Sequence, residues 1–224
     1  MNCSLLTGAR APLVRRLFGE DGTVAALDEE WLRFPPIWAG GYTACPRMAL
    51  VFINPTPRNQ SAREGWRGDR APFLGIRRPW KFLASCGLLR DDVVDSLPAD
   101  QCWTKNDAET LYNHVAESGL YVTNLVKACR SSADMPSAAF ARPFVALLRR
   151  ELALVQPGVV VSMGGLVSSL LLGGPFRLSA ATDYLGRTGK PLVAGSFGSS
   201  AVIPSYFPVG RGSPTRARAI LAAV

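Results

Sequence analysis

Short apolar runs alternate along the chain with longer stretches in which apolar residues recur every three or four positions. The runs are rich in β-branched residues and predict buried strands, whereas the longer spacing predicts amphipathic helices. The expected strands are 47–53, 120–123, 159–163 and either 192–194 or 201–203. The expected helices are 23–34, 107–118, 137–155, 166–172 and 214–223. Pro143 lies within the third of these helices, so it either kinks that helix or marks its true start.

The alternation of strands and helices favours a parallel sheet that is covered by helices on both faces. A chain of 224 residues is long enough to bury a proper core and usually forms one domain. We therefore expect a single domain over residues 1–224, a three-layer α/β/α sandwich around a central, mostly parallel sheet of four strands.

The chain is basic, with a formal net charge of +8 at pH 7 and a pI of about 9.7. A surplus of this size favours an anionic partner, with nucleic acid first and an acidic membrane surface second. The alternative is an organism whose proteins are basic and rich in arginine throughout. Hydrophobic residues make up 48% of the chain and charged residues 19%, which is typical of an ordered globular protein.

Cysteine use and the absence of a secretory leader point to a reducing compartment. The five cysteines lie far apart and form no C-x-x-C pair, so we expect mostly buried thiols; they are Cys3, Cys45, Cys86, Cys102 and Cys129. The longest uncharged stretch, 152–176, contains Pro157 and several glycines, and it fits a strand, a turn and a buried helix better than a membrane span. A cytoplasmic location follows from these features.

Several common chemistries lack their residues. The single histidine, His114, lies in an expected helix and is interpreted as a surface or packed residue. One histidine without paired cysteines argues against a zinc site, and no G-x-S-x-G segment accompanies it. The sequence contains neither a phosphate-binding G-x-x-x-x-G-K-[ST] loop nor the glycine spacing of a dinucleotide site.

Polar residues instead mark the ends of the expected strands. Asn54 ends the first strand and is followed by Pro55 and Pro57, so the chain cannot continue there as a central strand. Asn124 ends the second strand. Ligands bind at the carboxyl ends of strands in open α/β sheets, and the long arginine-rich connection 58–70 is a candidate functional loop near the same edge.

Five segments, in this order, resemble the uracil-DNA glycosylase superfamily. Residues 52–56 (Phe-Ile-Asn-Pro-Thr) are similar to its first motif, G-I-N-P-G in the mismatch-specific branch and G-M-N-P-G in the single-strand-selective branch. The thermophile-type branch is the most similar in overall pattern. Its G-x-P-F-x-G, Y-I-T-N-V-V-K-C-R, E-L-x-L-I-x-P-K-V-I-V-x-L-G and T-Y-H-P segments correspond to 71–75, 121–130, 152–164 and 205–208. The resemblance covers roughly residues 48–219.

The resemblance implies an enzyme that flips a base out of DNA and holds it in a pocket. Phe73 would stack on the base, and the Asn124 amide would read the adjacent carbonyl and N–H of uracil. Asn54 would position the attacking water, while Ile53 and Thr56 would line the base pocket. The residues expected to contact DNA phosphates are Arg58, Arg63, Arg67 and Arg211.

Two departures from the family pattern affect the chemistry. Phe207 stands where most members have a catalytic histidine that stabilises the departing base, so either catalysis is slower or Ser205, Tyr206 or a backbone N–H substitutes. Thr56 stands where the branch most restricted to uracil has a tyrosine, which implies a wider pocket. Only one cysteine, Cys129, falls near a position of the iron–sulfur ligands of the thermophile-type branch, so we expect no metal and no cofactor.

The favoured interpretation is a monofunctional glycosylase that acts as a monomer on uracil-containing DNA, releases free uracil and binds no membrane. A non-catalytic nucleic-acid-binding protein that kept the fold is the main alternative, and a hydrolase of free nucleosides is a weaker one. The polar Asn54 on a rigid turn favours catalysis over simple binding.

Overall fold

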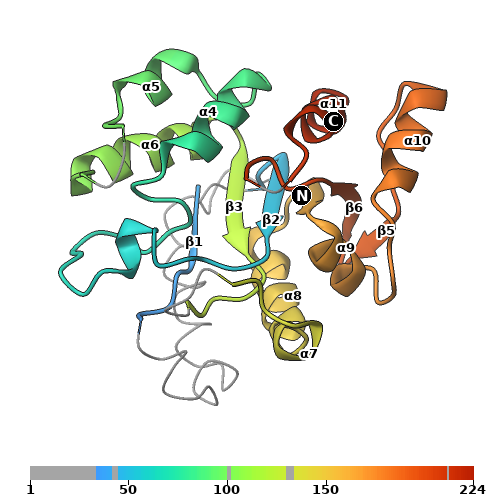
Figure 1. Ribbon diagram of the computed structural model, residues 1–224, viewed down its shortest axis with the longest axis horizontal. Helices are drawn as coiled ribbons and strands as arrows, with labels where there is room; N and C mark the ends of the chain where they lie inside the picture. The colour runs from blue at the N-terminus through green and yellow to red at the C-terminus, as the bar shows by residue number, and fades with distance from the viewer. Residues whose placement is uncertain (1–33, 42–44, 100–101, 130–133, 211) are drawn as a thin grey trace.

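The computed structural model describes residues 34–41, 45–99, 102–129, 134–210 and 212–224. Its sheet has six strands in the order β1-β3-β2-β4-β6-β5 (Figure 1). Their bounds are β1 Ala39–Gly40, β2 Met48–Phe52, β3 Leu120–Asn124, β4 Val159–Met163, β5 Gly195–Phe197 and β6 Ser200–Ser205. The four inner strands pair in parallel, whereas β1 and β5 pair antiparallel at the two edges.

The expectation of a mostly parallel α/β sheet is confirmed, but the expected count of four strands is wrong for the described chain. The two additional strands contain only two and three residues, too few for an alternating pattern to be recognised in the sequence. Of the two candidates for the fourth parallel strand, 201–203 lies within β6. The other, 192–194, lies just before β5 and is outside any strand.

The expected helices after residue 100 are present with shifted bounds. The helices are α4 Arg77–Ser85, α5 Asp91–Ser96, α6 Lys105–Glu117, α7 Ala138–Ala141, α8 Phe144–Val155, α9 Gly165–Leu171, α10 Ser179–Thr188 and α11 Pro214–Ala222, with a 3-10 turn η1 at Gln60–Ala62. Pro143 separates α7 from α8, because proline has no N–H to give to the preceding turn. The expected helix 23–34 lies outside the described residues, apart from its last position.

The alternation of side chains along β2 divides the core into two parts. Met48, Leu50 and Phe52 face a cluster that includes residues of α4, α5, α6 and α11, whereas Ala49 and Val51 face α8 and α9. All five residues of β2 are buried, as expected for a central strand covered on both faces. Helices therefore flank the sheet on both sides (Figure 1).

The register brings residues distant in the sequence to one edge of the sheet. Phe52 lies opposite Asn124 in the parallel pairing of β2 with β3. The pairing continues past the strand ends, since Leu125 N donates to Phe52 O at 2.7 Å and Val126 N to Ile53 O at 2.9 Å. The residues on either side of the two asparagines are therefore held together by main-chain bonds.

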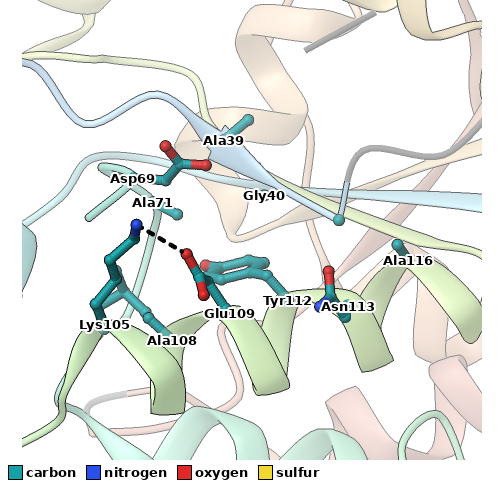
Figure 2. Close-up of a pocket in the computed structure, with 12 residues that line it drawn as sticks. Ala39, Gly40, Asp69, Ala71, Lys105, Ala108, Glu109, Tyr112, Asn113 and Ala116 are labelled. Carbon is teal, nitrogen blue, oxygen red and sulfur yellow. Dashed lines mark ion pairs between the residues drawn. The ribbon is translucent and has the colours of Figure 1, made fainter. Parts of the chain in front are cut away.

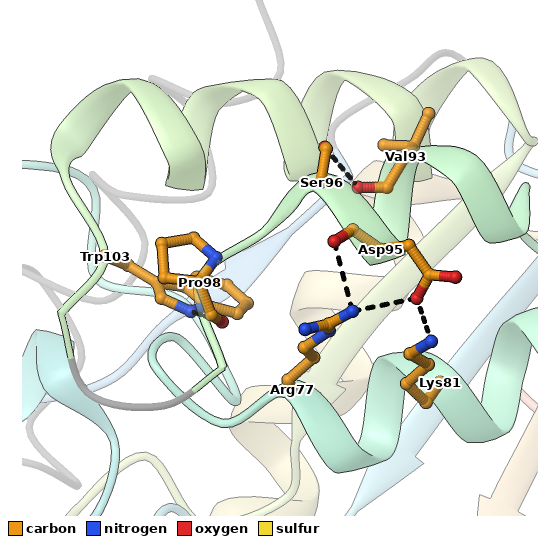
Figure 3. A network of polar contacts seen from close by, with 7 residues as sticks. All are labelled: Arg77, Lys81, Val93, Asp95, Ser96, Pro98 and Trp103. Carbon is orange, nitrogen blue, oxygen red and sulfur yellow. Dashed lines mark hydrogen bonds and ion pairs between the residues drawn. The ribbon is translucent and has the colours of Figure 1, made fainter.

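The helices α4 and α5, which follow the segment carrying Phe73, are tied to each other by charged side chains. Arg77 Nη2 donates to Asp95 Oδ1 at 2.8 Å, and Lys81 pairs with the same carboxylate (Figure 3). Lys81 and Asp95 are exposed and Arg77 is half-buried, and ion pairs in contact with solvent stabilise a fold only slightly. The tighter anchor is Trp80, which is fully buried and donates from Nε1 to Phe73 O at 3.1 Å.

His114 and the cysteines differ in how far they match their sequence expectations. His114 is buried in α6 and accepts a hydrogen bond at Nε2 from Arg90 N at 2.9 Å, which confirms its packing role. Residues 152–176 include β4 and α9, as expected. Cys45 is disulfide-bonded, and of the three other cysteines in the described segments, Cys86, Cys102 and Cys129, only Cys129 is buried, so the expectation of mostly buried thiols is wrong there. No helix in the described residues is long and apolar enough to cross a membrane.

Candidate functional site

Asn54 lies just beyond β2, on the turn fixed by Pro55. Its Nδ2 donates to Pro55 O at 3.0 Å and reaches Asp134 O at 3.5 Å. Within the described chain both contacts use the nitrogen of the amide, so Oδ1 is the atom left to accept a hydrogen bond from water. Asn54 is half-buried at the carboxyl edge of the sheet.

Asn124 is the last residue of β3 and is only 1% exposed. Alternation along the strand places its side chain on the same face as Val122 and Phe52. Neither Oδ1 nor Nδ2 has a hydrogen-bond partner among the described residues. Leaving a buried amide unpaired costs about 1–3 kcal/mol, so Asn124 is a candidate to bind a partner that the described residues do not supply.

Three phenylalanines meet beside Asn124. The ring of Phe73 lies 4.7 Å from that of Phe52 at an interplanar angle of 86°, and the ring of Phe207 lies 6.0 Å from Phe52 at 89°. Phe52 thus joins the segment before α4 to the segment before α11. Both outer rings are only partly buried, so each has surface left for a planar ligand.

Phe73 has a backbone conformation that is unusual for its residue type. Its φ is +58°, in the left-handed region, where a non-glycine residue costs of order 1–3 kcal/mol. The conformation is held by Ile76 N and Trp80 Nε1, which both donate to Phe73 O at 3.1 Å. Gly75 follows with φ +74°. The strain is thus offset by a buried tryptophan, and the ring of Phe73 has a fixed direction.

A group of buried polar residues fixes the start of the 58–70 connection. Asn59 Oδ1 accepts from Ser61 N and Oγ, and its Nδ2 donates to Ala71 O at 2.9 Å. Gln60 Oε1 accepts from Trp103 N at 3.0 Å. These bonds hold the segment that leads into Phe73. Sequence reasoning treated 58–70 as a polar loop and missed them, because their partners lie up to 43 residues away.

Phe207, the residue at the position of the family histidine, follows β6, and its ring packs against Phe52. The loop that carries it is closed by Ser213 N, which donates to Phe207 O at 3.0 Å. A Cβ on Gly212 would lie 1.8 Å from that same oxygen, so the closure requires glycine there. The Phe207 side chain has no proton to donate.

Two hydroxyl groups next to Phe207 have different surroundings. Tyr206 OH lies 3.3 Å from Arg216 Nη1 and 3.5 Å from Thr182 Oγ1, so it is directed toward α10 and α11. Ser205 is fully buried, and its Oγ has no partner among the residues that the structure describes. Of the two candidate hydroxyls, that of Ser205 is therefore the one without a partner in the described structure.

The other expected site residues are placed less specifically. Ile53 packs with its side chain against the α8 face of the sheet, so a contact with a base on the Asn124 face would come from its backbone. Thr56 is half-buried on the turn after Asn54. Three of the expected phosphate-contacting residues are exposed along the connection, and they are Arg58, Arg63 and Arg67. Arg211 lies outside the described residues.

A separate pocket lies away from these residues. A pocket of about 140 Å³ opens between β1 and α6, where Lys105 pairs with Glu109 at 3.3 Å (Figure 2). None of Asn54, Phe73 and Asn124 lines it.

Among the described residues there is no group of three His, Cys, Asp or Glu side chains that could hold a metal ion. Burial raises the pKa of Cys129 to about 12, so this sulfur is a thiol at neutral pH.

A stability comparison of two buried asparagines tests whether Asn124 is unpartnered. Asn59→Ala removes three internal hydrogen bonds, so we expect it to lower the free energy of unfolding by about 1–3 kcal/mol. Asn124→Ala breaks none that the structure describes, and we expect less than half of that loss. Urea unfolding of both variants measures the difference. An equal loss in the two variants would show that the Asn124 amide has a partner inside the protein.

Comparison with known proteins agrees with the order of these elements. Residues 42–220 match the family described as the Uracil DNA glycosylase superfamily, a range that includes all four strands of the parallel part of the sheet. The match identifies the superfamily and does not distinguish its branches. No curated protein matches the sequence. With its parallel sheet and the matched range covering most of the sequence, the chain belongs to the uracil DNA glycosylase superfamily.

Proposed function

We propose that this protein is a monofunctional DNA glycosylase that hydrolyses the N-glycosidic bond of uracil in DNA and leaves an abasic site. The observation that carries the proposal is the buried amide of Asn124, with both polar atoms unpartnered among the described residues. Superfamily membership supports an activity of this type on uracil-type lesions. The basic charge of +8 supports a polyanionic substrate.

The amide of Asn124 matches the edge of uracil. Uracil presents an N–H beside a carbonyl, so Asn124 Oδ1 would accept from N3–H while Nδ2 donates to O4. A flipped base pays for its lost stacking by stacking again in the enzyme pocket, and the fixed, partly exposed ring of Phe73 is the proposed platform. Binding of uracil would then supply the partner that Asn124 lacks.

Asn54 is proposed to orient the attacking water through Oδ1. The bond between C1′ of the sugar and N1 of uracil breaks, and its electron pair leaves with the base. The water oxygen bonds to C1′, and the proton that it releases ends on uracil. Because the sugar becomes cationic before attack, a neutral amide that holds the water in place is sufficient.

Charge on the departing base must be stabilised without a histidine. Phe207 supplies no donor, and the proposed substitute is the buried hydroxyl of Ser205 or a backbone N–H nearby. The loss of one such donor typically costs a factor of about 10²–10³ in rate. We therefore propose slow catalysis. Thr56 in place of a bulky tyrosine supports a pocket that also accepts bases larger than uracil.

The phenylalanine at position 207 is also the observation that favours the second candidate, a nucleic-acid-binding protein without catalysis.

The placement of Lys127 bears on a different alternative, a lyase that would use an amine nucleophile. Its side chain is fully buried and ion-paired with Glu151 at 2.6 Å, so this amine cannot reach a sugar. Because Lys127 cannot serve as the nucleophile, the reaction that we propose is hydrolysis by water. We also propose that the protein acts on DNA as a monomer.

Release of uracil from a single-uracil oligonucleotide, followed by alkaline cleavage at the abasic site, tests the proposed activity. We expect wild-type protein to cleave, and Asn54→Ala and Asn124→Ala each to lower the single-turnover rate by a factor of at least about 10². Asn113→Ala, at an exposed asparagine of α6, is the matched control and should leave the rate unchanged. Binding without cleavage by the wild-type protein would favour the non-catalytic alternative.

Restoring the family histidine tests the interpretation of Phe207. Phe207→His places a hydrogen-bond donor on the loop after β6, and we expect the single-turnover rate of uracil release to rise by about tenfold or more. The rise should be smaller above pH 7.5, where an imidazole of ordinary pKa, about 6.5, is neutral. Phe207→Leu serves as the control, because it alters the packing on Phe52 without adding a donor. A histidine variant no faster than the leucine variant would contradict this role of position 207.

A further inference from the structure

A buried ion pair lies behind Asn124, on the opposite face of the sheet. Lys127 Nζ pairs with Glu151 Oε2 at 2.6 Å, and both side chains are fully buried. Lys127 belongs to the segment that follows β3, whereas Glu151 is on α8. Thr123 and Tyr121 of β3 face the same side of the sheet, since their positions alternate with that of Asn124.

The hydrogen bonds around this pair converge on the carboxylate. Tyr121 OH donates to Glu151 Oε1 at 2.8 Å, and Thr123 Oγ1 donates to the same oxygen at 2.7 Å. Lys127 Nζ in turn donates to Thr123 Oγ1 at 2.6 Å. This pattern requires an ionised carboxylate that accepts and a charged ammonium that donates. Every donation runs toward Glu151, directly or through Thr123.

A buried ion pair is a poor way to stabilise a fold. The cost of removing two charges from water often exceeds their attraction, and apolar side chains of similar size frequently do as well. Burial lowers the pKa of Lys127 while the Glu151 carboxylate raises it, so the ammonium depends on Glu151 to stay protonated. The pair therefore calls for an explanation other than stability, and its neighbours provide one.

The network is linked to both asparagines of the site, through neighbouring residues in the sequence and through main-chain hydrogen bonds. Thr123 immediately precedes Asn124, so the hydrogen bond from its hydroxyl to Glu151 constrains the residue next to Asn124. Lys127 O accepts from Ile37 N at 2.9 Å, and Val126 N donates to Ile53 O, one residue before Asn54. A change in the direction of Lys127 would move the turn 124–127 and, through Ile53, the Asn54 turn.

We propose that Lys127 and Glu151, acting through Thr123, are positioning residues that hold Asn124 in the orientation that reads the base. This inference rests on the proposed function and names residues that act without touching substrate. The backbone of Asn124 is held by the pairing of β3 with β2, but its side-chain amide has no hydrogen bond among the described residues, so the ion pair adds a constraint next to a side chain that has none of its own.

A double-mutant cycle tests the coupling. Lys127→Met with Glu151→Gln replaces the charged pair by a neutral one, leaving no uncompensated charge and keeping an acceptor for Tyr121 and Thr123. We expect this variant to release uracil about tenfold more slowly in single turnover, because small misplacements of a binding group reduce rates by such factors. The same change made in Asn124→Ala should have little further effect, less than about twofold, since the group being positioned is gone.

Additional measurements separate positioning from a merely structural role. The neutral pair should bind undamaged DNA as tightly as wild type, and Lys105→Met with Glu109→Gln, at an exposed pair of α6, should leave the rate unchanged. Thr123→Val removes the bridging hydroxyl at constant volume and should also slow release, whereas Thr123→Ser should restore it. Thr123→Val supplies the test if the neutral pair does not fold, and Asn124→Ser replaces Asn124→Ala if the latter releases no measurable uracil.

The outcomes distinguish this inference from the proposed function on which it rests. The positioning role would be overturned if the neutral pair slowed uracil release equally in the wild-type protein and in Asn124→Ala. It would also be overturned if neither the neutral pair nor Thr123→Val slowed uracil release. If Asn124→Ala itself retains the wild-type rate, the base-reading role of Asn124 fails instead. If wild-type protein releases no uracil at all, the proposed function fails.

Discussion

The parallel pairing of β2 with β3 determines how the rest of the site is arranged. It sets Phe52 opposite Asn124 and continues past the strand ends through Leu125 and Val126, so that both asparagines emerge at one edge. A slip of one residue would exchange the faces of β3 and send Asn124 into the core under α8. The register is protected because apolar residues of β2 and β3 are buried on both faces, and any slip would expose or misplace them.

The site combines polar side chains that have hydrogen-bond partners among the described residues with one side chain that has none. Asn59 and Thr123 have internal partners, and they hold the segments that carry Phe73 and Asn124. The Asn124 amide has none within the described chain, and Phe73 has a strained backbone. The surrounding bonds offset both costs, which is the usual arrangement at a binding site that must be preorganised.

The sequence was sufficient to predict the central strands, the polar residues at their ends and the helices that follow them. These features depend on local patterns, and the family resemblance assigned Phe73 and Asn124 to one base pocket. Contacts between residues distant in the sequence could not be predicted. The ion pair of Lys127 with Glu151 is an example, because a sequence does not distinguish buried charged residues from the more common exposed ones. The helix α10 was missed because its contact with the core is small: Ala181 is its one fully buried residue, and Leu185 is only partly buried.

The side-chain amide signals of ¹⁵N-labelled protein, titrated with free uracil, test the central claim most directly. The signals of Asn124 are assigned by their loss in Asn124→Ala, and those of Asn59 serve as an internally bonded reference. The account predicts that uracil shifts the Asn124 pair and leaves the Asn59 pair in place. An Asn124 pair that does not respond while uracil binds elsewhere on the protein would contradict it.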